Sequence, residues 1–135
     1  MGAWGTAVFS DDSALDSLQA LVSAKSPKNY MREAFDSALA SKYLEYDAAH
    51  AVLVSAAVMD TILNGTSHAD NPESLELWLS DNAGLDVAAL KPLAKAAIAR
   101  VLGKGSELEE LWRENVGDYP SWRAGIEGIS GRLNA

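Results

Sequence analysis

Apolar residues recur at intervals of three and four along most of the chain, which is the spacing of one buried helical face. Leu15, Leu18 and Leu21 show this spacing, and no stretch alternates with the period of a strand over more than a few residues. Asp, Ser or Pro precedes most of these stripes and Gly follows several, as at helix boundaries. We expect helices that start near residues 12 and 27, span 47–64, 72–82, 91–102 and 106–117, and start again near 118.

The segment 47–64 differs from the others because it is apolar on nearly every side. Such a helix needs neighbours all around it, so we expect it at the centre of the fold, with Gly65 as its C-cap. Pro92 removes a backbone donor, which predicts a short turn up to Leu90 before the next helix. The sequence therefore predicts a single all-α domain over 1–135, a bundle of about six to seven helices with a short non-helical N-terminal arm.

Aromatic residues are expected mainly in the core. Trp4 and Phe9 would tuck the N-terminal arm onto the helices, and a recognition surface is the alternative role for Trp4. Trp78, Trp112 and Trp122 fall on apolar faces of predicted helices, which indicates core packing.

Two patterns near the C-terminal end predict local contacts. Ser106 and Glu109 have the spacing of a capping box, in which each side chain bonds the backbone N–H of the other residue. Gly125, Gly128 and Gly131 recur at every third position of the last helix. Because Gly destabilises a helix, this stripe indicates either close approach of a neighbouring element or a weak, frayed terminal helix.

The composition excludes several classes of protein. A chain of 135 residues with 48% hydrophobic residues is long and apolar enough to bury a core, so general disorder is excluded. The absence of Cys excludes a disulfide scaffold, a thiolate metal site and a Cys nucleophile. The 19 Asp and Glu exceed the 11 Lys and Arg by a net charge of −8, which argues against nucleic acids and anionic membranes as partners.

Candidate catalytic chemistry is sparse. Asp11, Asp12 and Asp16 cluster at a helix start, where carboxylates serve as caps more readily than as ligands of a cation. His50 is predicted at the edge of the core, hydrogen-bonded, and His68 in a solvated loop, and their separation does not match a zinc-binding helix motif. Neither a nucleophile elbow nor a phosphate-binding loop occurs. We therefore expect no enzyme, no metal and no cofactor.

Several short motifs resemble an uncharacterised bacterial family, the domain of unknown function numbered four-two-five-nine. The motifs are Met1-Gly2-Ala3-Trp4-Gly5, Phe9-Ser10-Asp11-Asp12-Ser13-Ala14-Leu15-Asp16, Tyr43-Leu44-Glu45 followed by an Ala-rich helix from Ala48 to Met59, the segment from Ser106-Glu107-Leu108 to Trp112, and Trp122-Arg123. Together they cover essentially the whole chain. The resemblance implies a small bacterial cytosolic domain, with some members encoded beside secreted toxins.

The negative charge is concentrated in one part of the chain. Residues 1–24 carry −3, 25–44 carry +2, 45–90 carry −8 and 91–135 carry +1. The segment 45–90 has no Lys or Arg and includes the central helix, so its acids should gather at the helix ends and over 70–86. Such a surface steers a basic partner, and it is equally the pattern of a solubilising face.

These features predict a small acidic interaction protein, most concretely an immunity protein in the bacterial cytoplasm. Its partner would be a cognate toxin domain with a basic, nuclease-type surface, as in contact-dependent growth inhibition. The predicted partner-binding residues are Asp70, Glu73, Glu76, Leu77, Asp81 and Asp86, with the leucine as an apolar anchor. The alternatives are a helical domain with a housekeeping or oligomer-forming role, and a metal-dependent hydrolase that uses the three aspartates of 11–16 with His50.

Overall fold

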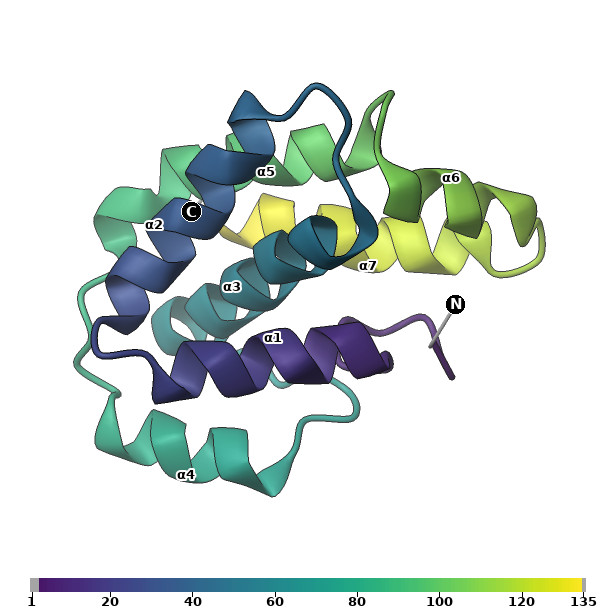
Figure 1. Cartoon of the computed structure of the whole chain (residues 1–135). Helices are drawn as coiled ribbons and strands as arrows, with labels where there is room; N and C mark the ends of the chain where they lie inside the picture. The colour runs from purple at the N-terminus through teal and green to yellow at the C-terminus, as the bar shows by residue number, and fades with distance from the viewer. Residues whose placement is uncertain (1–2, 135) are drawn as a thin grey trace.

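A computed structural model describes residues 3–134, which form seven α-helices and one 3₁₀ turn (Figure 1). The elements are α1 (Asp12–Ser23), α2 (Pro27–Ala40), α3 (Tyr46–Asn64), α4 (Glu73–Asp81), η1 (Ala88–Leu90), α5 (Lys91–Leu102), α6 (Glu107–Glu114) and α7 (Tyr119–Arg132). No strand occurs in this part of the chain, so the predicted all-α fold is confirmed. The turn η1 stands where Pro92 predicts it, directly before α5.

The helix α3 lies at the centre of the bundle, and α1, α2, α5, α6 and α7 pack around it (Figure 1). From Ala49 to Asp60 every residue except Ala51 is buried, as the all-round apolar pattern predicts. Gly65 ends the helix in the left-handed conformation with φ 71°. By length and composition alone α3 would suffice to cross a membrane, but most of it is covered by the surrounding helices.

The start of α6 differs from the predicted capping box. The Ser106 hydroxyl makes no cap hydrogen bond, and Glu109 accepts hydrogen bonds from Arg113 and Tyr119 instead. The Glu107 N–H, which the box does not involve, donates to the Leu44 carbonyl at 2.9 Å. A backbone hydrogen bond therefore ties the first turn of α6 to the loop before α3, and it satisfies one of the free N–H groups at this helix start.

The N-terminal arm is held by Phe9 and not by Trp4. Phe9 is 1% exposed, whereas Trp4 is 55% exposed and is fixed through its backbone N–H, which donates to the Ser10 carbonyl. The predicted core role is confirmed for Trp112 and Trp122, whose rings stack at 5.8 Å between α6 and α7.

Candidate functional site

The helix α4 presents most of the predicted partner-binding residues to solvent. Leu75 is buried against the core, whereas Leu77 is 65% exposed. Glu73, Glu76 and Asp81 are exposed as well. The prediction that Leu77 lies off the buried stripe is therefore confirmed, and this leucine is surrounded in sequence by carboxylates.

The remaining two predicted partner-binding residues, Asp86 and Asp70, flank α4, and only one of them has a hydrogen-bond partner described within the chain. Asp86 is exposed in the segment that leads to η1. Asp70 is exposed too, but its carboxylate accepts a hydrogen bond from the Ser10 hydroxyl, and its backbone adopts φ 59°. Asp70 therefore ties the loop before α4 to the N-terminal arm.

The helix α1 extends the acidic surface of α4. The two helices pack against each other and lie side by side in Figure 1. The exposed acids of α1 are Asp12 and Asp16, and neither helix contains Lys or Arg. Counting charge along the sequence missed this extension, because only tertiary packing brings α1 beside α4. We call Asp12, Asp16, Glu73, Glu76, Leu77 and Asp81 the acidic face.

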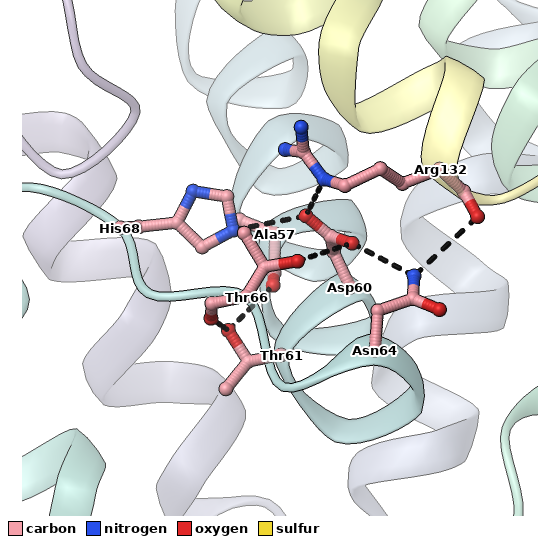
Figure 2. A network of polar contacts seen from close by, with 7 residues as sticks. All are labelled: Ala57, Asp60, Thr61, Asn64, Thr66, His68 and Arg132. Carbon is pink, nitrogen blue, oxygen red and sulfur yellow. Dashed lines mark hydrogen bonds and ion pairs between the residues drawn. The ribbon is translucent and has the colours of Figure 1, made fainter.

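Asp60 is an exception to the predicted gathering of acids at the surface. Its side chain is fully buried on α3, and Figure 2 shows it at the centre of a polar network. Arg132 donates from Nε to Oδ2 at 2.8 Å. Asn64 and Thr66 donate to Oδ1 at 2.9 and 3.0 Å. A buried carboxylate requires such a partner charge and hydrogen bonds, so Asp60 adds nothing to the surface charge.

His68 joins this network and is not solvated, contrary to the prediction. Its side chain is 11% exposed, and Nε2 lies 3.3 Å from Oδ2 of Asp60. The loop after α3 folds back over the helix end, which also places the ring edge-on to Phe9. Burial lowers the pKa of His68, Asp60 opposes that shift, and Arg132 adds to it.

One glycine of the stripe on α7, Gly128, makes room for Arg132. A Cβ at Gly128 would lie 3.2 Å from Nη1 of Arg132, so the small residue lets the side chain fold back along its own helix toward Asp60. No atom lies within 4 Å of a Cβ built at Gly125 or Gly131. Of the two alternatives for this stripe, close approach of a neighbouring element does not hold at Gly125 and Gly131, and the close contact at Gly128 comes from α7 itself.

Asp11 caps α1 and does not join the two aspartates that follow it. Its Oδ1 accepts hydrogen bonds from the N–H groups of Ser13 and Ala14, and its Oδ2 from the Tyr46 hydroxyl. Asp11 is buried, whereas Asp12 and Asp16 are exposed. No group of three potential metal ligands occurs within residues 3–134, so the structure offers no support for a hydrolase based on this cluster.

His50 is buried beside Asp11 without a hydrogen bond to it. Nε2 of His50 lies 3.5 Å from Oδ2 of Asp11, and its ring packs on Tyr46 at 4.7 Å. Neither ring nitrogen has a hydrogen-bond partner among the described residues, so the predicted hydrogen bond is not formed. Burial lowers the pKa of His50, and the charges of Asp11 and Asp47 oppose that shift.

Acidification from about pH 7 to about pH 5 is expected to lower the free energy of unfolding through these two histidines. Their pKa values are lowered in the folded chain, so the unfolded chain binds protons first as the pH falls. The stabilising contribution is complete above the ordinary histidine pKa of about 6.5 and is lost below it. Urea unfolding at several pH values measures this slope.

The double variant His50→Gln/His68→Gln is the control for this prediction, because it removes both titrating rings. Its free energy of unfolding should depend less on pH over the same interval, whatever its absolute stability. A slope equal to that of the parent chain would show that other groups cause the acid sensitivity.

Two of the motifs that carry the family resemblance, Tyr43-Leu44-Glu45 and the segment that begins at Ser106, meet just before α3. The Tyr43 hydroxyl donates to Glu110 at 2.8 Å, and the Tyr46 N–H donates to Glu107 at 2.8 Å. Leu44 pairs with the backbone beside Ser106. These residues hold two loops together, whereas α4 contributes none of the motifs. These hydrogen bonds thus join the start of α3 to α6.

Comparison with known proteins gives one family. The model of a family described as a domain of unknown function, DUF4259, matches residues 2–125. No curated protein and no solved structure matches the chain.

Proposed function

This chain belongs to the DUF4259 family, a domain of unknown function, and we propose that it is an interaction protein whose acidic face binds a basic protein partner. In its most concrete form it is an immunity protein that binds and neutralises a nuclease-type toxin domain in the bacterial cytoplasm. The observation that carries this proposal is the exposure of Leu77 among the carboxylates of α4.

The acidic face suits a partner that binds phosphate. A nuclease presents clustered Lys and Arg to its substrate, and a surface of the opposite sign steers such a protein into encounter and fixes its orientation. The exposed Leu77 supplies an apolar contact that the charges alone would not provide. Binding across the acidic face would also cover the basic surface that the nuclease needs for its substrate.

The buried polar groups favour binding over catalysis as the role of this chain. Asp11 is occupied by the helix cap, and Asp60 by its network with Arg132. His50 and His68 are both enclosed, and each faces one of these carboxylates. These are the properties of groups that stabilise a core, so we place the function on the exposed surface.

Reversing two charges on α4 is expected to weaken the complex with the product of the adjacent reading frame. Glu73→Lys/Glu76→Lys should lower the affinity by about tenfold to a hundredfold, mainly through slower association. Leu77→Ala should act mainly on the dissociation rate, because an apolar anchor is lost after encounter. Surface plasmon resonance at two salt concentrations separates the two effects.

The matched control is Glu114→Lys/Glu127→Lys, which makes the same change in net charge outside the acidic face. Its affinity should stay close to that of the parent chain. Equal losses of affinity in both double variants would show that the effect depends on net charge and not on the position of the charges. If Glu73→Lys/Glu76→Lys binds the partner with unchanged affinity, α4 is not part of the interface.

A further inference from the structure

A groove opens where α1, α2 and the first half of α3 meet, and it consists of two adjoining hollows. The first has a volume of about 300 Å³ and is lined by Ser13, Asp16, Ser17, Tyr30, Asp47 and Ala51. The second has a volume of about 220 Å³ and is lined by Tyr30, Glu33, Ala34, Ser37, Ala48 and Ala51. The hollows share the lining residues Tyr30 and Ala51 and therefore adjoin. We call them together the α1–α3 groove.

The rim of the α1–α3 groove is acidic. Asp16, Glu33 and Asp47 are exposed, and each comes from a different helix. The residues that line the two hollows include no Lys or Arg. Asp16 and Asp47 line the first hollow and Glu33 lines the second, with no cation among the lining residues of either, which leaves a negative potential along the groove.

The floor of the α1–α3 groove is apolar. It is formed by the half-buried side chains of Ala34, Ala48 and Ala51. Between the two hollows stands Tyr30, whose hydroxyl lies 2.8 Å from the Ser17 hydroxyl. The methyl groups leave space above α3 that larger side chains would fill, so the groove accepts a slender apolar stem.

We propose that the α1–α3 groove receives an arginine side chain of the protein partner. The aliphatic stem lies on the alanine floor, and the guanidinium lies between Asp16 and Asp47. This inference rests on the proposed function, because the arginine belongs to the same basic partner. Asp16 is part of both surfaces, so the groove continues the acidic face toward α2.

The groove chemistry matches arginine better than lysine. A guanidinium carries five N–H donors in one plane and can reach acceptors on several sides at once. The groove offers carboxylates from two helices together with hydroxyl oxygens, so acceptors lie on more than one side of the cavity. The Tyr30 ring beside them provides an aromatic surface on which a guanidinium stacks well. An ammonium group makes fewer simultaneous contacts and is more strongly hydrated.

A short peptide tests the groove without the natural partner. The probe is a blocked alanine pentapeptide with one central arginine, titrated into ¹⁵N-labelled full-length protein at low ionic strength. We expect its binding to shift the amide resonances of Ser17, Ala34 and Ala51. The same peptide with citrulline keeps the shape without the charge and should cause no such shifts, and the lysine peptide should bind more weakly.

Variants of the lining separate charge from shape. Asp16→Asn/Asp47→Asn should bind the arginine peptide about tenfold more weakly, because two charged acceptors are lost. Ala51→Leu fills the floor shared by the two hollows and should weaken binding with every charge retained. Asp36→Asn/Glu114→Gln is the matched control and should bind as the parent chain does. Circular dichroism confirms that each variant is folded.

The proposal is overturned if the citrulline peptide binds equally well, if the lysine peptide binds as tightly as the arginine peptide, or if the shifts map outside the groove. It is also overturned if the control variant loses as much affinity as Asp16→Asn/Asp47→Asn. These results are independent of the α4 variants. If the groove binds the arginine peptide but the chain binds no basic protein, the proposed function is refuted and the arginine site is not.

Discussion

Replacing Arg132 with methionine is expected to lower the free energy of unfolding by about 2–3 kcal/mol. The change removes the cation that faces Asp60 at 2.8 Å and leaves a fully buried carboxylate with hydrogen bonds but no opposite charge. The loss stays below the range for fully buried pairs because the Arg132 side chain is 41% exposed. Urea denaturation at neutral pH measures it.

A second substitution, at Asp60, tests whether the buried charge causes this loss of stability. In Arg132→Met/Asp60→Asn the buried group is neutral, so the double variant should recover more than half of the stability that Arg132→Met loses. If both variants are equally unstable, the loss arises from the packing of the arginine stem across Gly128 and not from the charge of Asp60.

Asp11→Ala is expected to have the second largest effect, a loss of about 2–3 kcal/mol in the free energy of unfolding. Asp11 supplies the side-chain cap of α1, and its removal deprives the N–H groups of Ser13 and Ala14 of their acceptor. The Tyr46 hydroxyl loses the same carboxylate. Both effects occur at a buried site, where water does not readily replace the lost acceptor.

Asp12→Ala is the matched control, because it removes the same carboxylate one residue later. Asp12 is exposed in the first turn of α1, so its contribution is limited to the helix dipole and should stay within about 0.5 kcal/mol. Losses of similar size in both variants would show that the charge at the helix start, and not the cap geometry, stabilises α1. Thermal unfolding followed by circular dichroism is sufficient for the comparison.

The helices could be predicted from the sequence because their signals are local. Ser26 and Pro27 start α2, Gly65 ends α3, and Pro92 lies in the first turn of α5, directly after η1. Each signal acts through the backbone within a few residues, so no knowledge of the fold is required. The exposure of Leu77 followed from the same periodicity.

The polar contacts could not be predicted, because they join distant parts of the chain. Arg132 and Asp60 stand on different helices, and the sequence, from which the acids of 45–90 were expected at helix ends and over 70–86, does not indicate that Asp60 is buried against Arg132. His68 likewise looks like a loop residue until the loop folds back onto α3. Ser106 and Glu109 matched a local motif, but the Glu109 carboxylate accepts hydrogen bonds from Arg113 and Tyr119 instead. The acidic face combines both kinds of information, since α4 was predicted and the contribution of α1 was not.

The bond between Asp60 and Arg132 also sets an order of events during protein synthesis. The two residues are 72 positions apart, so at ordinary rates of translation about 4–15 seconds pass between their synthesis. Throughout that interval α3 is a long apolar segment with an acid that lacks its cation. Burial of α3 before α7 has been made would enclose Asp60 without its cation, so complete packing of the bundle around α3 is favoured only once the chain has been synthesised through Arg132.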